Sequence, residues 1–373
     1  MGGTKSSLEV LEVNLFANIY DGKRVLVTGH TGFKGSWLSL WLTELGAEVI
    51  GVSLSPETNH NHWDMVNLAI DDRRCDIRDA VEVEKIIKSI QPEMIFHLAA
   101  QPLVRRAYND PLETWSTNVM GTVNVLEACR NTPSVQAIVA ITSDKCYENC
   151  GLSRGYREDD RLGGYDPYSA SKAGSELVAA SYRRSFLDAG AGALLATARA
   201  GNVVGGGDWS EDRLIPDLIR AINEHKSLEI RSPHATRPWQ HVLDALSGYL
   251  VLGQKLLMGC REVAGPWNFG PELEGNRTVL EVLGKLNDAW TETDLSWHET
   301  RIFQPYEADL LYLDSNRAKT KLNWQPVWNI DSTIEKTVDW HKQWLQTGNV
   351  ISKQQLDSYT ADANDAKIEW ANS

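Results

Sequence analysis

Short runs of aliphatic and β-branched residues alternate with longer amphipathic stretches through the first half of the chain. The short runs predict strands, and the stretches between them, which repeat apolar residues at helical spacing, predict helices. The predicted strands cover residues 23–28, 47–54, 94–98 and 135–142, with one more before Asp76, and the predicted helices cover residues 37–45, 81–90 and 111–130. Strands that alternate with helices predict an α/β fold with a doubly wound parallel sheet, whose ligands bind beyond the carboxyl ends of the strands.

The pattern changes near residue 203, where Gly205–Gly207 and several Pro and Trp residues indicate loops and short elements. We expect this part to form a smaller mixed α/β lobe over the edge of the sheet. Its predicted helices cover residues 214–225, 240–256, 278–290 and 331–345. From Ile351 onward the chain is polar and acidic, and we expect this tail to fray.

Composition narrows the class of protein. A chain of 373 residues with 42% hydrophobic residues can bury a full core. The formal net charge of −13 argues against nucleic-acid binding, but a few arginines and helix N-termini could still hold an anionic small molecule. Five scattered cysteines favour reduced thiols in a cytoplasmic protein, and their spacing predicts no metal site. No apolar stretch has the length of a membrane span, so we expect no membrane partner.

A glycine-rich turn, GHTGFKG at residues 29–35, follows the first predicted strand and opens the first predicted helix. In this position, backbone N–H groups and a helix N-terminus can bind the pyrophosphate of a dinucleotide. The second strand ends at Ser53 instead of the acidic residue that commonly holds the ribose of NAD, so this motif does not decide between NAD and NADP. The residues of the turn that we expect to contact the cofactor are Gly29, Thr31, Gly32, Phe33 and Gly35.

A second group of residues has the pattern of a catalytic site. Tyr168 and Lys172 lie four apart, hence on one face of a helix, where the ammonium group can lower the pKa of the phenol and make it a general base. Ser143 follows a predicted buried strand, at the rim where ligands bind, and is expected to hydrogen-bond the substrate. Asp144 and Lys145 come next; as an isolated pair they would fit an ion pair on a solvated loop equally well.

These motifs together resemble the extended short-chain dehydrogenases/reductases, and Asp144 resembles the acid that follows the catalytic Ser or Thr in their nucleotide-sugar dehydratase branch. The dTDP-glucose and GDP-mannose dehydratases of this branch have Asp-Glu at the positions of Asp144 and Lys145. The Ser143-Asp144-Lys145 sequence instead resembles the Ser-Asp-Lys of the CDP-glucose 4,6-dehydratases. The likeness runs from about residue 21 to residue 345. Four longer stretches carry it: VTGHTGFKGSWLSLWL at 27–42, TSDKCYEN at 142–149, GGYDPYSASK at 163–172 and ARAGNVVGGGDW at 198–209.

The resemblance implies NAD as the cofactor and a Rossmann-type sheet to hold it. It adds contacts from two strand ends and from the catalytic helix, although Asp76 by itself would also fit a helix cap. These further contacts are Asp76, Ile77, Leu98, Ala99, Ala100, Gln101, Tyr168 and Lys172.

The reaction that the resemblance implies is an internal oxidation and reduction of CDP-glucose. Tyr168, assisted by Ser143 and Lys172, takes the O4 proton while hydride passes from C4 to the nicotinamide; water then leaves across C5 and C6, and hydride returns to C6. Asp144 protonates the departing hydroxyl. Lys145 either takes the C5 proton, if its pKa is depressed, or stabilises the enolate as a cation. The product is a precursor of deoxy sugars in surface polysaccharides such as the O-antigen of lipopolysaccharide.

Other residues resemble the family's contacts to the nucleotide end of the substrate, although each arginine alone would fit a surface salt bridge. They are Asn118, Asn202, Arg213, Arg237 and Asn268. Family members dimerise through the helix carrying Tyr168 and the segment 111–130, which implies a homodimer or a dimer of dimers.

We therefore divide the chain into an N-terminal extension (1–20), an NAD-binding catalytic domain (21–202), a mainly substrate-binding lobe (203–350) and a polar acidic tail (351–373). Two alternatives stay open: a dehydratase or epimerase acting on another nucleotide sugar, and a regulatory protein that binds NAD without turnover. Asp144 disfavours an epimerase, and the complete set of Ser143, Tyr168 and Lys172 disfavours a non-catalytic protein.

Overall fold

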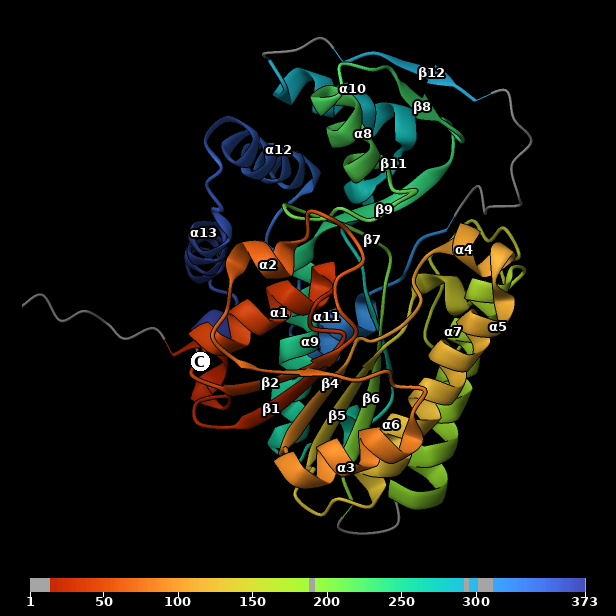
Figure 1. Cartoon of the computed structure of the whole chain (residues 1–373), viewed down its shortest axis with the longest axis vertical. Coiled ribbons are helices and arrows are strands. Elements are labelled where there is room, and N and C mark those ends of the chain that lie inside the picture. The colour runs from red at the N-terminus through yellow and green to blue at the C-terminus, as the bar shows by residue number, and fades with distance from the viewer. Residues whose placement is uncertain (1–13, 188–191, 292–294, 301–310, 373) are drawn as a thin grey trace, which may run out of the picture.

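The computed structural model describes residues 14–187, 192–291, 295–300 and 311–372. Within these residues, seven parallel strands form one sheet in the order β10-β6-β5-β4-β1-β2-β3 (Figure 1). This confirms the predicted doubly wound α/β fold. The strands are β1 (Arg24–Thr28), β2 (Glu48–Ser53), β3 (Asp71–Arg74), β4 (Met94–His97), β5 (Ala137–Ile141), β6 (Leu194–Ala200) and β10 (Pro266–Phe269).

Side chains of the central strands alternate between two apolar layers. On β1, Val25 and Val27 join the layer that contains α1 (Phe33–Glu44) and α9 (Val242–Leu257). Leu26 joins the opposite layer, which is completed by the helices on the other face of the sheet. Because both faces are covered, the strands read as continuous apolar runs. The helices of the second layer are α3 (Ala80–Ile90), α6 (Gly121–Arg130) and α7 (Pro167–Tyr182).

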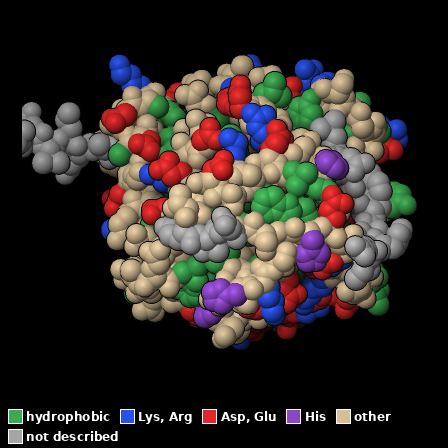
Figure 2. All heavy atoms as spheres, turned by 90° about the horizontal axis from the view of Figure 1, so that it is seen from above, with side chains coloured by type: hydrophobic (Ala, Val, Ile, Leu, Met, Phe, Trp, Pro, Cys, Tyr) green, Lys and Arg blue, Asp and Glu red, His purple; other side chains and the backbone are tan. Residues whose placement is uncertain are grey.

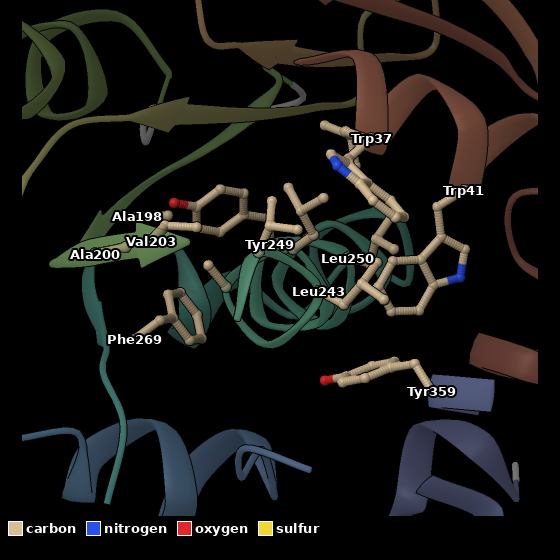
Figure 3. Close-up of a cluster of buried hydrophobic side chains, with 14 of the residues drawn as sticks. Trp37, Trp41, Ala198, Ala200, Val203, Leu243, Tyr249, Leu250, Phe269 and Tyr359 are labelled. Atoms are coloured by element: carbon tan, nitrogen blue, oxygen red, sulfur yellow. The ribbon is translucent and has the colours of Figure 1, made fainter. Parts of the chain in front are cut away.

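Helix α9 lies inside the protein, with fourteen of its 16 residues buried. Figure 3 looks along it: Trp37 and Trp41 of α1 pack on one side, and Phe269 of β10 and Tyr359 pack on others. The prediction of a helix over 240–256 is confirmed. This helix and β10 both come from the part of the chain beyond residue 203, so that part also contributes to the central sheet and its covering layer.

The second lobe holds two small sheets. One consists of β7 (Asn202–Val204), β9 (Thr236–His241) and β11 (Asn276–Thr278), and the other pairs β8 (Leu228–Ile230) with β12 (Trp297–Glu299). The predicted helices of this lobe are present. Further helices of the chain are α2 (His62–Val66), α4 (Val104–Asn109), α8 (Leu214–Asn223), α10 (Val279–Ala289), α11 (Asn316–Leu322) and α12 (Ile330–Thr347).

The predicted single helix over 111–130 has a more complex form. It consists of α5 (Pro111–Trp115), a π-helical turn η2 (Ser116–Met120) and α6. Such turns are rare and recur near functional sites. Here the turn carries Asn118, which is buried and hydrogen-bonded on both sides of its amide group.

The expectation that the tail frays is wrong. Residues Ser352–Asp365 form helix α13, which buries Leu356, Tyr359 and Ala363 at helical spacing against the core. After it, Trp370 stacks on Phe16 with ring centroids 4.8 Å apart, so both ends of the described chain close the same apolar layer. Burial of these side chains stabilises the tail although its composition is polar.

Three features of the described residues bear on the expected partners: the surface charge, the hydropathy of the helices and the grouping of candidate metal ligands. Acidic and basic side chains are intermingled on the face seen in Figure 2. No helix of the described residues is both long and apolar enough to cross a bilayer. The same residues bring together no cluster of three or more His, Cys, Asp or Glu side chains that could hold a metal ion.

A buried carboxyl group joins α9 to the C-terminal part of the chain. Asp244 is fully buried, and its Oδ1 accepts hydrogen bonds from the Val327 backbone N–H at 2.7 Å and from the Tyr359 hydroxyl at 2.8 Å. Burial raises the pKa of Asp244 to about 7. The neutral acid is therefore favoured in the folded state.

Replacing this group should change how stability depends on pH. As pH rises above the ordinary Asp pKa of 3.8, the unfolded chain ionises Asp244 while the folded protein keeps it neutral until about pH 7, so the free energy of unfolding falls through this window. Urea unfolding of the wild type and Asp244→Asn measures the effect. From pH 5 to pH 7 the wild type should lose roughly 2 kcal/mol relative to the variant. A difference independent of pH would contradict the assignment.

Candidate active site

A cavity of about 1250 Å³ opens at the carboxyl edge of the sheet, against the second lobe. Its walls come from segments that follow β1 to β6 and from residues 207–217 and 228–232 of the lobe. This is the position that the topology predicts for a ligand. The predicted site residues that line it are Gly29, Thr31, Gly32, Phe33, Gly35, Asp76, Ile77, Leu98, Ala99, Ala100, Gln101, Ser143, Asp144, Lys145, Tyr168, Lys172, Asn202, Arg213 and Arg237.

Two residues that were expected to contact the substrate, Asn118 and Asn268, are not among the residues that line the cavity. The amide of Asn118 exchanges hydrogen bonds with the backbone of Gln101 at 2.8 and 3.1 Å and donates to Ser171 at 2.8 Å. Asn268 accepts from the Tyr147 hydroxyl at 2.7 Å. Both side chains are buried with their hydrogen bonds made inside the protein, so they support the site from behind its walls.

The glycine-rich turn has the close backbone packing that a pyrophosphate site needs. Gly29 has φ +74°, and a Cβ there would lie 2.7 Å from the backbone nitrogen of Ala99. A Cβ on Gly35 would overlap the carbonyl oxygen of Gly29, so the start of α1 packs directly on the turn. The positive φ at Gly29 and the close backbone contacts at Gly29 and Gly35 require glycine at these two positions. The N–H groups in the first turn of α1 remain near the cavity. The turn therefore fits the expected dinucleotide.

The neighbouring strand ends complete this side of the cavity. Ser53 stands at the strand end where an acidic residue is common, and its hydroxyl lies 2.8 Å from the Thr31 hydroxyl. Asp76 accepts hydrogen bonds from the Arg78 guanidinium, which holds the pKa of this carboxyl below its usual value. The cap of α3 is Asp79, whose carboxylate accepts from two backbone N–H groups. The alternative interpretation of Asp76 as a helix cap is therefore excluded.

The chain turns sharply after β5, where the predicted catalytic residues 143–145 lie. Ser143 caps the short helix η3 (Asp144–Cys146) and its hydroxyl donates to Asp144 Oδ1 at 3.0 Å. The side chain of Asp144 is buried, and its Oδ2 has no hydrogen-bond partner among the described residues. Asp144 and Lys145 form no ion pair in the described part of the chain, so the alternative of a solvated pair on a loop does not hold. Lys145 is half-buried and lines the cavity.

Tyr168 and Lys172 lie on one face of α7 as predicted, and both are buried. Burial raises the pKa of Tyr168 to about 12, while its hydrogen bond with Ser143 and the charge of Arg213 act in the opposite direction. Burial lowers the pKa of Lys172 to about 8, and its ammonium group donates to the Ile141 carbonyl at 3.4 Å. Burial therefore raises the pKa of Tyr168, whereas the sequence pattern predicts that the Lys172 ammonium lowers it.

Sequence reasoning missed a charged residue inside the glycine turn. Lys34 lines the cavity, and burial, followed by the positive charge of Arg213, lowers its pKa to about 7; the negative charge of Asp144 opposes them. The sequence held a signal for it, because Lys34 lies within the glycine-rich turn that was expected to contact the cofactor. This turn was considered mainly for its backbone N–H groups, and the Lys34 side chain was overlooked.

The far wall of the cavity carries the predicted substrate residues. Arg213 directly precedes α8, and its guanidinium forms an ion pair with buried Asp208 at 2.9 Å. Arg237 is buried on β9, and Asn202 begins β7 beside it, in register with Trp239. Two arginines on one wall give a planar set of donors suited to phosphate oxygens.

Comparison with known proteins places this geometry in a family. The model of the family described as GDP-mannose 4,6 dehydratase matches residues 26–337. The chain belongs to this family. It is 46% identical over 350 residues to CDP-glucose 4,6-dehydratase of Salmonella typhimurium, covering 92% of this chain and 97% of that protein. A probable dTDP-glucose 4,6-dehydratase of Sinorhizobium fredii is 26% identical, covering 85% and 92%.

Solved structures share the fold of this dehydratase family member. The dTDP-glucose 4,6-dehydratase DesIV of Streptomyces venezuelae, with NAD and TYD bound, has a TM-score of 0.72 at 24% identity and covers 86% of this chain and 97% of its own. UDP-glucose 4-epimerase of Thermus thermophilus in complex with NAD has a TM-score of 0.73 at 24% identity, covering 86% and 99%. Both support the same Rossmann-type sheet.

The glycine cradle can be tested by adding one methyl group. Gly35→Ala should abolish measurable NAD binding, because its Cβ would displace the Gly29 carbonyl and open the turn. Isothermal titration with NAD measures the affinity, and circular dichroism checks that the variant is folded. Gly284→Ala on α10, where a Cβ meets nothing within 4 Å, is the matched control and should bind like the wild type. Unchanged binding by folded Gly35→Ala would show that the cofactor lies elsewhere.

Proposed function

We propose that this protein is an NAD-dependent CDP-glucose 4,6-dehydratase, which converts CDP-D-glucose to CDP-4-dehydro-6-deoxy-D-glucose and water. The observation that carries the proposal is Asp144, a buried acid whose Oδ2 has no hydrogen-bond partner among the described residues, adjacent to Ser143 in a cavity shared with Tyr168. Oxidation or epimerisation at C4 needs no such acid, whereas loss of water needs a proton for the departing hydroxyl. The 46% identity to a CDP-glucose 4,6-dehydratase supports this substrate.

The oxidation step uses the residues at the end of β5 and on α7. Bound NAD supplies the reversible two-electron oxidation of the sugar, which the protein alone cannot perform. Tyr168 takes the proton of the 4-hydroxyl, and Ser143, hydrogen-bonded to Tyr168, orients that hydroxyl. Because burial raises the pKa of Tyr168, positive charge near the phenol is required; Arg213 supplies part of it, and Lys172 lies one turn along the same helix.

The elimination step uses the next two residues of the chain. A ketone at C4 acidifies the hydrogen on C5, so that a proton can leave without a very unstable carbanion. Lys145 takes the C5 proton and returns it when the sugar is reduced at C6; once protonated, its ammonium group stabilises the enolate. Asp144 donates its proton to the C6 hydroxyl as water departs. The free Oδ2 of Asp144 supports this role, because a buried oxygen without a partner is suited to a ligand hydroxyl.

The nucleotide end of the substrate is assigned to the second lobe, residues 203–350. Arg213 and Arg237 bind the diphosphate, and Asn202 contacts it from the start of β7; all three line the cavity. The catalytic domain, residues 21–202, binds NAD. The enzyme is further proposed to work in the cytoplasm, which the five free cysteines support, since reduced thiols persist there.

The substrate is tested directly with purified protein and NAD. Separate incubations with CDP-glucose, dTDP-glucose, UDP-glucose and GDP-mannose are followed by mass spectrometry, with Tyr168→Phe as the background control. Loss of one water from CDP-glucose, without net reduction of NAD, is the expected result. Loss of water from a different sugar nucleotide alone would keep the chemistry and overturn the substrate. No reaction with any of them would overturn the proposed function.

The role of Asp144 predicts a separation of two steps. Asp144→Asn should slow the release of water by about 100-fold or more, because the amide cannot protonate the leaving hydroxyl, while oxidation at C4 is affected far less. Rapid-quench mass spectrometry distinguishes the 4-keto sugar from its dehydrated product. Asp79→Asn, at a helix cap outside the cavity, is the control and should retain both rates. Equal slowing of both steps would contradict the acid role.

We also propose that the protein forms a homodimer, or a dimer of dimers, through α5, η2 and α7. Helices α5 and α7 lie side by side (Figure 1) and leave several large apolar side chains exposed. An apolar patch of this kind on a folded protein commonly marks an interface. The exposed side chains are Leu112, Trp115, Met120 and Leu177.

Charges placed on this patch should separate the subunits. Leu112 and Leu177 are 82% and 61% exposed, so Leu112→Glu/Leu177→Glu should fold normally yet sediment as a monomer, because two carboxylates would be buried in the interface. Leu273→Glu, at a position 71% exposed on η6 (Leu273–Gly275), is the matched control. Analytical ultracentrifugation measures the mass. A double variant that keeps the wild-type mass would exclude this interface.

A further inference from the structure

A charged pair lies behind the cavity and forms no part of its walls. Glu176 on α7 and Arg199 on β6 are 3% and 2% exposed, and two hydrogen bonds of 2.9 and 2.8 Å join the guanidinium to the carboxylate. Thr142 and Thr197 also donate to Glu176, at 2.5 and 2.8 Å. Burial acts to raise the pKa of Glu176, but the charge of Arg199 and these hydrogen bonds outweigh it and hold the pKa below its usual value.

The same pair contacts both ends of the catalytic segment 143–146. Thr142, which precedes the segment, donates to Glu176. Tyr147, which follows it, accepts a hydrogen bond from Arg199 Nη1 at 2.7 Å, and the guanidinium carbon lies 4.8 Å from the centre of the Tyr147 ring. The segment is thus held at its start by the carboxylate and at its end by the guanidinium. A bidentate buried pair has little freedom to move, so these contacts fix the segment relative to α7.

The carboxylate also lies one helical turn from Lys172, on the same face of α7. The groups that face the Lys172 ammonium come from four elements: Glu176 on α7, Cys146 on η3, His97 on β4 and Lys34 on α1. Burial lowers the pKa of Lys172 to about 8, and the charge of Glu176 opposes that shift. His97 and Cys146 are neutral at pH 7, because burial lowers the pKa of the imidazole and raises that of the thiol. Glu176 is therefore the negative charge in this set.

We propose that Glu176 and Arg199 are positioning residues: the pair holds segment 143–146 against α7, and the Glu176 carboxylate keeps Lys172 in its ammonium form at neutral pH. The effect on turnover rests on the proposed function, but the charge of Lys172 is measured without substrate. Without the carboxylate, Lys172 would lose its proton at lower pH and could no longer lower the pKa of Tyr168.

The experiment titrates Lys172 directly. Protein labelled with ¹³C at the lysine Cε is followed by NMR across pH, and the signal is assigned by its loss in Lys172→Met. In Glu176→Gln the midpoint should fall by about one pH unit or more, since a nearby carboxylate in a low-dielectric site shifts an ammonium by this order. The alkaline limb of kcat/KM for CDP-glucose should move down by the same amount. Glu176→Asp keeps the charge and should keep both near the wild-type value, with a lower kcat because the contacts to the segment lengthen.

Two further variants keep the test decisive. Glu176→Gln/Arg199→Gln leaves no buried charge unpaired and serves if the single variant does not fold; its midpoint should also fall, but by less, because the positive charge of Arg199 is lost as well. Asp244→Asn removes a buried carboxyl group far from α7 and should leave the midpoint unchanged.

Each outcome has one meaning. An unchanged midpoint in Glu176→Gln and in Glu176→Gln/Arg199→Gln, or a uniform loss of turnover at all pH values, would overturn the inference and leave a merely structural pair. A falling midpoint in a protein that converts no nucleotide sugar would support the role of Glu176 while overturning the proposed function.

Discussion

Burial of helix α9 is the constraint on which the rest of the structure depends. Its side chains fill the space between the sheet, α1 and the C-terminal helix α13, so the layer on this face of the sheet contains a helix with almost no contact with water. Such a helix must be apolar all round, and its polar groups must be satisfied inside the protein. Asp244 meets this condition at Oδ1, which accepts from the chain that follows α11 and from α13, whereas its Oδ2 has no hydrogen-bond partner among the described residues. The cavity is built on the rigid support that results.

Much of the fold could be predicted from the sequence because the sheet is covered on both faces. Its central strands β1, β4 and β5 are therefore largely apolar runs, and the turn after β1 carries glycine where the backbone packs closely, as at Gly29. The tail was mispredicted because its average polarity hides Leu356, Tyr359 and Ala363, which recur at helical spacing and bury one narrow face. The π-helical turn at 116–120 was missed for a related reason: its residues fit an ordinary helix, and only packing around Asn118 distinguishes it.

The residues near the reaction were predictable where a motif fixes both residue type and spacing, as for Tyr168 and Lys172. Residue type alone was insufficient elsewhere: Asn268 has the right chemistry for a ligand, but its amide is used by Tyr147 and by the backbone behind the wall. Desolvation is also invisible in a sequence. It sets the pKa directions of Tyr168, Lys172 and Lys34, because three ionisable groups share one buried space with Asp144 and Arg213. The charge balance of this space is thus a property of the folded chain, because these groups come from α1, η3, α7 and the residue that precedes α8.

The stacking of Phe16 on Trp370 has a consequence for how the protein is made. A ribosome releases residue 16 long before residue 370, so the apolar layer that contains both rings cannot close until almost the whole described chain has left the exit tunnel. Until then Trp41 and Tyr359 also lack their final neighbours. During synthesis strands β1 to β6 and the layer on the opposite face, whose buried apolar residues all precede residue 196, can assemble first, while the face that α9 later covers still lacks its final neighbours.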